Sequence, residues 1–278
     1  MKGDFVFVKK RNKGRIMTST ATSKDGTKIA YDKIGHGPLV IIVGGALSTR
    51  SGWTEQKLAM LLAPDFAVVN YDRRGRGDST DTLPYALQRE VEDIVALLDA
   101  FGGSGYLYGI SSGAALALVA ASILGDEVQK LALYDAAYDS SDEGRNATRE
   151  YNKQLEKLLS SGKRGDVVAL FMKFVQVPDD QINFMRNSPM WPGLEALAPT
   201  LAYDSAVLGE DRSVPTELAA KVTATTLVLY GEASPPSMRE SAQVLKEAIP
   251  NAQLRMLIRQ THDVQPEALA PVLEEFFQ

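Results

Sequence analysis

The sequence predicts an α/β protein with a mostly parallel central sheet flanked by helices and an inserted helical cap. Short apolar runs alternate with helix-like segments on both sides of a long middle stretch. Such alternation is typical of parallel strands that are joined by crossover helices. The middle stretch, residues 137–213, contains helix-like segments but no convincing core strand. A helical insertion between two parallel strands would lie over the strand ends as a cap.

Composition narrows the chemistry that this chain of 278 residues can perform. It contains no cysteine, so disulfides, thiolate metal sites and cysteine nucleophiles are excluded. The net charge of -5 argues against a general nucleic-acid-binding surface. The two histidines are His36 and His262. We interpret His36, in a Gly-His-Gly-Pro turn before an apolar strand, as a surface residue. His262 is then the credible candidate for any step that needs a histidine as a base.

The amino-terminal segment differs in charge from the rest of the chain. Residues 1–16 hold six basic residues and one acidic residue. We interpret residues 1–17 as a basic leader that is either not native or disordered, with Met17 as an alternative start. No apolar core of a signal peptide follows it, and no run reaches the ~18 apolar residues that span a membrane. We expect a cytoplasmic monomer or homodimer that binds neither membrane nor nucleic acid.

The first half of the chain is predicted to form a hairpin followed by alternating strands and helices. Asp25-Gly26 accommodates positive φ, so Thr20–Lys24 and Thr27–Lys33 are predicted to form a β-hairpin. The continuous apolar run Leu39–Val43 predicts a strand buried on both faces. The next predicted elements alternate as helix and strand: Thr54–Leu62, Phe66–Asp72, Tyr85–Phe101, Gly105–Ile110, Ser112–Leu124 and Val128–Asp135.

The alternation resumes after the insertion. The predicted strands and helices there are Thr225–Gly231, Pro236–Ile249, Ala252–Ile258 and Pro266–Phe276. Within the insertion we expect helices over Arg145–Ser160, Asp166–Val175 and Gly193–Leu208. We therefore divide the chain into a core, residues 18–136 and 214–278, and a cap, residues 137–213.

A Gly-x-Ser-x-Gly pattern at Gly109, Ser111 and Gly113 lies between an apolar strand and an alanine-rich helix. A serine at a sharp strand-to-helix turn has a strained backbone, and side chains two positions to either side would clash. Glycine removes those clashes, and Ala114 and Ala115 let the helix pack close to the sheet. The helix N-terminus adds positive potential beside the hydroxyl. The pattern predicts an activated serine rather than a simple glycine-rich turn.

At these residues the chain resembles the α/β-hydrolase family, and the resemblance extends over about residues 20–278. Leu39–Leu47 resembles the oxyanion-loop strand of the family. Tyr71–Ser79 resembles its Asp-x-Arg-Gly-x-Gly-x-Ser turn, and Thr261–Asp263 lies where it keeps the catalytic histidine. The resemblance implies the α/β-hydrolase fold with a nucleophile elbow.

The resemblance also implies a role for individual residues. Ser111 would be the nucleophile, and His262 the base that a serine hydroxyl needs at neutral pH. The backbone N–H groups of Ala46 and Ser112 would form the oxyanion hole. In this chain Gly44-Gly45 stands where the family usually has His-Gly, which should loosen the loop without removing the Ala46 donor.

The catalytic acid is where the chain departs from the family pattern. Ser234 occupies the usual acid position, and a serine cannot stabilise an imidazolium as a carboxylate does. We favour Asp135, which ends a predicted strand at a position that some members of the fold use for the acid. Glu232, two residues before Ser234, is the second choice, whereas Asp263 would point elsewhere. The absence of a working acid is the remaining alternative.

Two further groups of residues have a mainly structural interpretation. The charged residues Asp72, Arg73, Arg74 and Asp78 are expected to tie neighbouring loops together. Most of the large apolar residues of the insertion should form its own core; they are Phe171, Met172, Phe174, Met185, Met190 and Trp191. The rigid loop at Met190 and Trp191 is expected to line the substrate pocket, which suits a small to medium apolar molecule.

These residues predict a carboxylesterase-like serine hydrolase that cleaves an ester or related acyl bond of a small-molecule substrate. No metal or organic cofactor is expected. Cofactor-free perhydrolases or haloperoxidases and hydroxynitrile-lyase-like members of the fold match Ser111 and His262 equally well. A haloalkane dehalogenase is disfavoured, because Ser111 stands where that enzyme has a carboxylate. A homologue that binds a small ligand without catalysis is the alternative outside the enzymes.

Overall fold

A single sheet of eight strands forms the centre of the computed structural model, which describes residues 17–278. The strands lie in the order β1-β2-β4-β3-β5-β6-β7-β8. β1 and β2 are antiparallel to their neighbours, whereas all pairs from β4 to β8 are parallel. The bounds are β1 Met17–Thr22, β2 Lys28–Ile34, β3 Leu39–Val43, β4 Ala67–Tyr71, β5 Gly105–Ile110, β6 Val128–Tyr134, β7 Thr225–Gly231 and β8 Ala252–Leu257.

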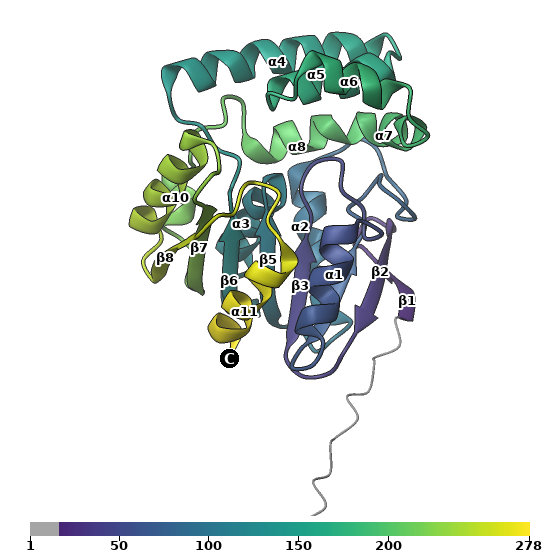
Figure 1. Cartoon of the computed structure of the whole chain (residues 1–278). Coiled ribbons are helices and arrows are strands. Elements are labelled where there is room, and N and C mark those ends of the chain that lie inside the picture. The colour runs from purple at the N-terminus through teal and green to yellow at the C-terminus, as the bar shows by residue number, and fades with distance from the viewer. Residues whose placement is uncertain (1–16) are drawn as a thin grey trace, which may run out of the picture.

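Helices cover both faces of this sheet, and further helices lie beyond the carboxyl ends of its parallel strands (Figure 1). The bounds of the core helices are α1 Trp53–Leu62, α2 Leu87–Asp99, α3 Ser112–Leu124, η1 Gly125–Glu127, α9 Thr216–Ala219, α10 Pro236–Ala248 and α11 Pro266–Phe277. Apolar residues of α1 and α11 pack against one face, and those of α2, α3 and α10 pack against the other. The mostly parallel sheet with flanking helices confirms the predicted fold class.

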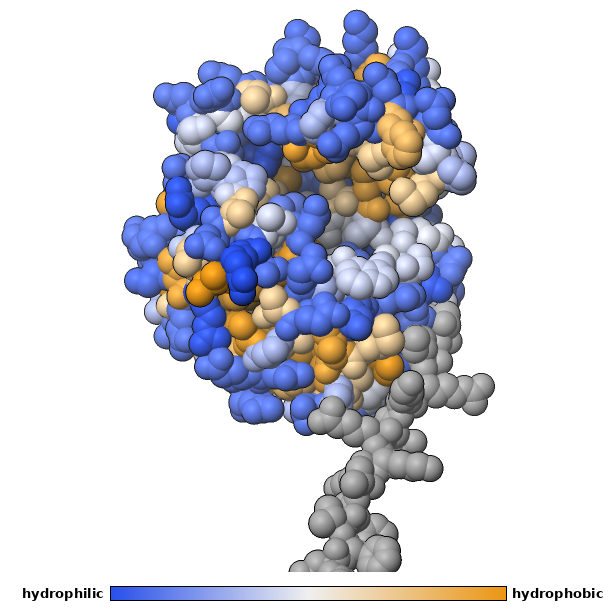
Figure 2. All heavy atoms as spheres, in the orientation of Figure 1, coloured by the Kyte–Doolittle hydropathy of each residue, from blue (hydrophilic) through white to orange (hydrophobic). Residues whose placement is uncertain are grey.

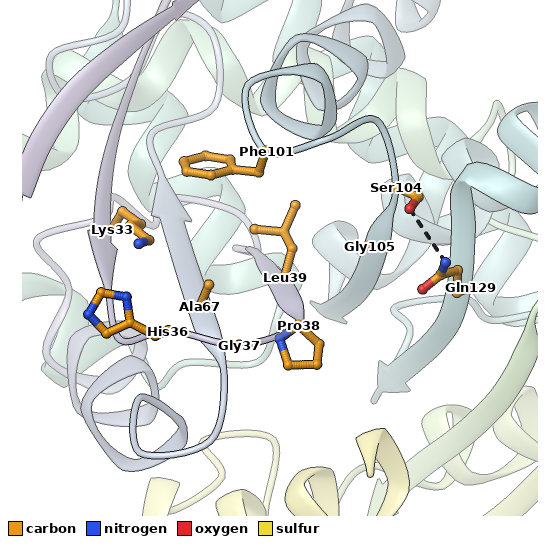
Figure 3. Close-up of a pocket in the computed structure, with 10 residues that line it drawn as sticks. All are labelled: Lys33, His36, Gly37, Pro38, Leu39, Ala67, Phe101, Ser104, Gly105 and Gln129. Carbon is orange, nitrogen blue, oxygen red and sulfur yellow. Dashed lines mark hydrogen bonds between the residues drawn. The ribbon is translucent and has the colours of Figure 1, made fainter.

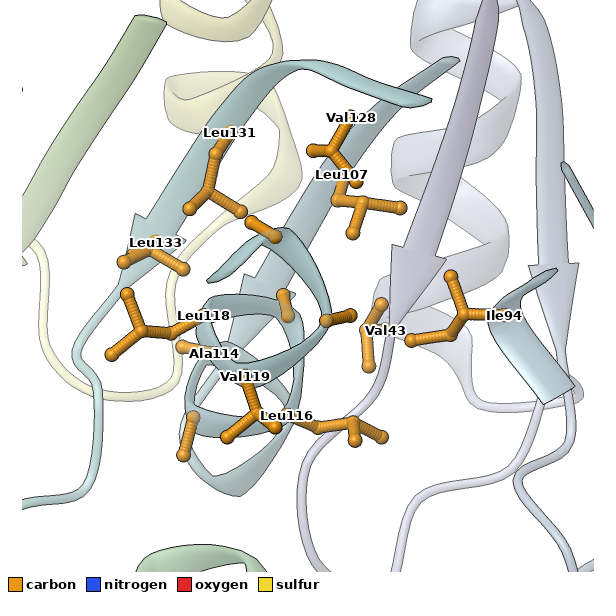
Figure 4. Packing of buried hydrophobic residues seen from close by; sticks show 14 of the residues in the cluster. Val43, Ile94, Leu107, Ala114, Leu116, Leu118, Val119, Val128, Leu131 and Leu133 are labelled. Carbon is orange, nitrogen blue, oxygen red and sulfur yellow. The ribbon is translucent and has the colours of Figure 1, made fainter. Parts of the chain in front are cut away.

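Burial explains why the apolar runs became central strands. Every residue of β3 and of β4 is buried, as expected for strands covered on both faces. The alanine-rich α3 lies directly against β5 and β6, and its Leu116 and Leu118 are fully buried beside Leu107 and Leu131 (Figure 4). Each such leucine stabilises the fold by about 1.5–3 kcal/mol. The serine elbow is thereby attached to a fully buried part of the core.

The helical insertion connects β6 to β7 and lies over the carboxyl ends of the strands (Figure 1). Its bounds are α4 Asp142–Ser160, α5 Arg164–Phe174, α6 Asp179–Arg186, α7 Trp191–Leu197, η2 Ala198–Thr200 and α8 Leu201–Leu208. An apolar cluster of its own, which includes Leu155, Val168 and Trp191, holds these helices together. We call α4–α8 the cap. The proposed limits of the cap at residues 137 and 213 stay a prediction.

Three local expectations need correction. The first hairpin strand is Met17–Thr22 and ends two residues before the predicted Lys24, and the second begins at Lys28 and not at Thr27. The reason is that Thr27 N–H donates to Asp25 Oδ1 at 3.0 Å and closes a longer turn. The helix expected over Gly193–Leu208 is divided into α7, η2 and α8, since Pro199 cannot donate to a continuous helix. Helix α6 was not expected.

Within residues 17–278, no helix is both long enough and apolar enough to cross a membrane. The expected basic leader lies outside the described residues except for Met17, where β1 begins.

Candidate active site

Ser111 lies at the turn from β5 into α3, with φ 58° and ψ -126°. A β-carbon on Gly113 would approach the Val43 carbonyl oxygen to 2.1 Å, and one on Gly109 would approach the Gly113 carbonyl oxygen to 2.5 Å. Both contacts are with backbone, which cannot move aside. The glycines that flank Ser111 are therefore required by the close approach of α3 to β3 and β5.

Asp135 and His262 form a pair beside this turn. Asp135 follows β6, the parallel neighbour of β5, and Ser111 N–H donates to the Tyr134 carbonyl at 3.1 Å. The Asp135 side chain is fully buried and lies 3.3 Å from His262 Nδ1. A carboxylate at this place favours the proton on Nδ1, which leaves Nε2 free to accept a proton. This tautomer is assigned from the hydrogen bond.

Neighbouring groups hold the Asp135 carboxylate and the loop of His262. Ser234 Oγ donates to Asp135 Oδ2 at 2.5 Å, and Gly231 N–H donates to Oδ1 at 3.3 Å. Tyr134 donates its hydroxyl to the Thr261 carbonyl at 2.5 Å, which ties the end of β6 to the residue before His262. Ser234, read from the sequence as a lost acid, instead supports the acid next to it.

The other two candidate acids do not contact His262. Glu232 is exposed, and its carboxylate accepts the Arg259 N–H at 2.7 Å. Asp263 is exposed as well. Of the three carboxylates considered from the sequence, Asp135 is the one that the fold brings to His262.

The loop after β3 passes directly over the serine. A β-carbon on Gly45 would lie 3.0 Å from Ser111 Cβ and 3.6 Å from its Oγ. Neither the Ala46 N–H nor the Ser112 N–H donates a hydrogen bond within residues 17–278. Ser111 Oγ likewise has no hydrogen bond to His262 in the described part of the chain. The fold thus brings the loops together and leaves these groups without internal partners.

The two predicted pocket residues lie in the cap. Trp191 is 7% exposed within the cap cluster, where the Arg186 guanidinium lies 5.5 Å from its ring, and Met190 is 64% exposed. These positions agree with a role in the core and surface of the cap, and their role in a pocket stays a prediction. Ala46 and Leu47 pack against the same cluster. Figure 2 shows apolar residues beneath the cap, where the surface is hollowed.

A buried ionic cluster between cap and core was not anticipated. We call it the cap network; it comprises Arg73, Arg76, Glu90, Asp204 and Ser112. Arg73 donates to Glu90 twice at 2.7 Å, and to Asp204 of α8 at 2.7 Å. Asp204 also accepts from Arg76 at 2.8 Å and from Ser112 Oγ at 2.7 Å. None of the four ionic side chains is more than 5% exposed.

Electrostatics keep Asp204 ionised in this buried position. Burial by itself would raise the pKa of its carboxyl, but Arg76 and Arg73, helped by the Ser112 hydroxyl, outweigh burial and lower that pKa. Two arginines and two carboxylates balance in charge. Loss of one member would leave an uncompensated buried charge, which typically costs about 3–5 kcal/mol.

Other charges near the site have the structural role expected of them. Arg74 pairs with Asp93 at 2.7 Å and with Asp25 at 3.0 Å, which ties the loop after β4 to α2 and to the β1–β2 turn. Arg50 pairs with Asp72 and with Asp78. These contacts fix loops and do not approach Ser111.

Glu55, in the first turn of α1, is a half-buried carboxyl near the loop after β3. Its Oε1 lies 3.8 Å from the position of a β-carbon on Gly44. Burial raises the pKa of Glu55, and its own backbone N–H only partly opposes that shift.

His36 lies far from these residues, as expected. It is exposed and lines a cavity of about 470 Å³ together with Lys33, Pro38 and Phe101 (Figure 3). This cavity opens where β3 begins, whereas Ser111 lies beyond the opposite ends of the parallel strands. His36 therefore takes no part in the site.

Comparison with known proteins decides the family. A model of the alpha/beta hydrolase family matches residues 39–275. The chain belongs to the α/β-hydrolase family. An alpha/beta hydrolase from Sphaerobacter thermophilus is 48% identical over 94% of this chain and 100% of that one, with a TM-score of 0.85.

More distant members of the α/β-hydrolase family share the fold. A hydrolase from Pseudomonas aeruginosa is 22% identical over 93% of this chain and 97% of that one, with a TM-score of 0.73. A thermophilic esterase from Thermogutta terrifontis, with malate bound, is 23% identical over 93% and 97%, with a TM-score of 0.68. The family membership and these neighbours support a hydrolase.

Proposed function

We propose that this member of the α/β-hydrolase family is a serine hydrolase that cleaves an ester or related acyl bond. The observation that carries the proposal is the buried Asp135 carboxylate, 3.3 Å from His262 Nδ1, on the strand next to the one that ends at Ser111. Ser111 follows β5, Asp135 follows the neighbouring strand β6, and His262 lies in the loop after β8, so the proposed nucleophile, acid and base all follow carboxyl ends of strands in one sheet. This arrangement is the one that activates a serine hydroxyl.

The proposed reaction proceeds through an acyl-enzyme. Ser111 Oγ attacks the substrate carbonyl carbon, and its proton passes to His262 Nε2. Asp135 stabilises the imidazolium that forms, and His262 then protonates the leaving alcohol. Water, deprotonated by His262, attacks the acyl group and releases the acid together with the free serine.

The amides of Ala46 and Ser112 are proposed to hold the negative oxygen of the tetrahedral intermediate. Both N–H groups lack partners among the described residues, and the Gly45 backbone lies against Ser111. Donors that are already oriented cost no reorganisation when the charge develops.

The proposed substrate is a small to medium apolar molecule. Ala46 and Leu47 of the oxyanion loop pack against the apolar cap cluster, which supports an apolar boundary above Ser111. A contribution of Met190 and Trp191 to this boundary is part of the proposal. We also propose that residues 18–136 and 214–278 act as the catalytic core and residues 137–213 as its cap.

Labelling with a small fluorophosphonate tests the proposal. Intact mass should show a single adduct on the wild type and none on Ser111→Ala, because only an activated serine reacts. The Ser111→Ala variant should keep the thermal stability of the wild type. An unlabelled wild type would contradict the proposal and favour the non-catalytic ligand-binding homologue.

Ester hydrolysis must then be distinguished from the perhydrolase-like reaction of the same fold. Turnover of 4-nitrophenyl esters of increasing acyl length should depend on Ser111. A peroxidase-like activity in acetate and hydrogen peroxide that exceeds ester hydrolysis would favour the perhydrolase alternative instead.

A further inference from the structure

The Gly45 carbonyl, in the loop over Ser111, is held by two side-chain donors, besides the Ser48 backbone N–H at 3.4 Å. Arg76 Nη1 donates to it at 2.6 Å and Ser48 Oγ at 2.7 Å. The preceding carbonyl, that of Gly44, receives only a marginal contact from Arg73 at 3.5 Å. Arg76 is 1% exposed, so its guanidinium is shielded from bulk solvent.

Holding this carbonyl fixes the next N–H. The carbonyl of Gly45 and the N–H of Ala46 belong to one planar trans peptide, in which they point in opposite directions. Glycine resists rotation of a peptide less than any other residue does, and this loop has two in succession. The guanidinium on the oxygen also polarises the peptide and strengthens its N–H as a donor.

Asp204 connects Ser112, whose N–H is the second proposed donor, to the same guanidinium of Arg76. Its Oδ1 accepts from Arg76 Nη2 at 2.9 Å and from Ser112 Oγ at 2.7 Å, and its Oδ2 accepts from Arg76 Nη2 at 2.8 Å. One carboxylate of cap helix α8 therefore contacts both the arginine behind the Ala46 peptide and the residue that carries the other amide.

We propose that Arg76 and Asp204 are positioning residues, through which the cap holds the Ala46 and Ser112 amides in the geometry of an oxyanion hole. This inference rests on the proposed function, since the amides matter only if Ser111 attacks a carbonyl. It explains why a cap helix places an ion beneath the apolar cap, next to the elbow. Packing of α8 against the core is then required for stabilisation of the transition state, in addition to covering the proposed substrate pocket.

The loop after β4 supplies a matched control. Arg74 and Arg76 are both buried arginines that pair with carboxylates, but Arg74 donates to the Arg89 carbonyl on α2 and Arg76 to the Gly45 carbonyl. Arg76→Lys and Arg74→Lys should therefore lose similar stability. Lysine keeps the charge but cannot donate to the carbonyl and the carboxylate with one planar group.

The experiment measures kcat and KM for a 4-nitrophenyl ester, and the inhibition constant of a trifluoromethyl ketone, which forms an oxyanion on Ser111. Arg76→Lys should lower kcat about 10- to 100-fold with KM nearly unchanged. Its inhibition constant should rise by the same factor as kcat/KM falls. Arg74→Lys should keep kcat within about twofold of the wild type. Equal losses of kcat in both variants, or none in Arg76→Lys, would overturn the inference.

A second pair keeps the test decisive if a lysine variant does not fold. Asp204→Asn should lower kcat with unchanged KM. Asp93→Asn, which removes the charge of one of the two carboxylate partners of Arg74, should not; the opposite result would overturn the inference. Circular dichroism and urea unfolding establish that each variant is folded. Fluorophosphonate labelling of the wild type separates the two proposals. An unlabelled wild type contradicts the proposed function, whereas a labelled wild type with unaffected Arg76→Lys and Asp204→Asn contradicts this inference alone.

Discussion

At the scale of single residues, the proposed acid Asp135 and its neighbour Ser234 differ from the usual arrangement of the acid in the family. Ser234 stands at the acid position of the family pattern and donates to the buried carboxylate of Asp135, which contacts His262. Its hydroxyl supplies one hydrogen bond to an ion that burial would otherwise penalise. The chain therefore differs from the family pattern in which residue carries the carboxylate, Asp135 and not the residue at position 234. The carboxylate still lies beside His262.

Asp135→Asn should lower kcat about 10³- to 10⁴-fold, because a neutral side chain neither fixes the histidine tautomer nor stabilises the imidazolium. The matched change Glu232→Gln should leave kcat within about twofold, since Glu232 accepts from the Arg259 N–H and not from His262. Steady-state ester hydrolysis, with circular dichroism as a check of folding, measures both. Mild and equal losses would show that Asp135 is not the acid.

At the scale of elements, the elbow depends on a close approach that only glycine permits. Gly113→Ala places a methyl group 2.1 Å from the Val43 carbonyl oxygen and should destabilise the protein by about 3 kcal/mol or more, at the upper end of overpacking effects. Gly193→Ala, in α7, meets no atom within 4 Å and should stabilise it by about 0.5–1 kcal/mol. Urea unfolding followed by circular dichroism compares the two. A similar shift for both would contradict the packing argument.

The sequence predicted the core elements well because their signals are local. Leu39–Val43 is apolar throughout and became a strand buried along its whole length, and the pattern around Ser111 became the expected turn. The cap was less predictable. A run that looked like one helix is interrupted at Pro199, and α6 is only eight residues long, three of them charged.

The site was predictable where one short segment carries it and not where it depends on distant contacts. Asp204 lies in an ordinary helical stretch, and its partners Arg73 and Ser112 are 131 and 92 residues away. The signal for this ion pair in the sequence was only indirect. Asp204 is an acidic residue within the mostly apolar run Leu201–Leu208. Arg73 and Arg76 lie in a glycine-rich turn, where buried arginines would need a counter-charge. Ser234 could be judged only once the fold showed Asp135 beside it.

At the scale of the whole molecule, the cap network links stability to pH. Because the folded protein lowers the pKa of Asp204, its ionised form stabilises the fold above the ordinary value of 3.8. That contribution is lost as the pH falls through the lowered value. Wild type should exceed Asp204→Asn in unfolding free energy by about 3–5 kcal/mol at neutral pH, and the difference should shrink below about pH 4. Urea unfolding at a series of pH values measures it. A difference that stays constant in acid would contradict the assignment.

The position of α8 in the chain has a consequence for how the protein matures. A ribosome makes Arg73, Arg76 and Ser112 long before it makes Asp204, since 92 residues separate the last two. A nascent chain with strands β1–β6 assembled therefore holds its elbow and the loop after β3 without the carboxylate of Asp204, which we propose orients them. Assembly of the first six strands and completion of the proposed oxyanion hole are thus separate events in time, and docking of the cap marks the second.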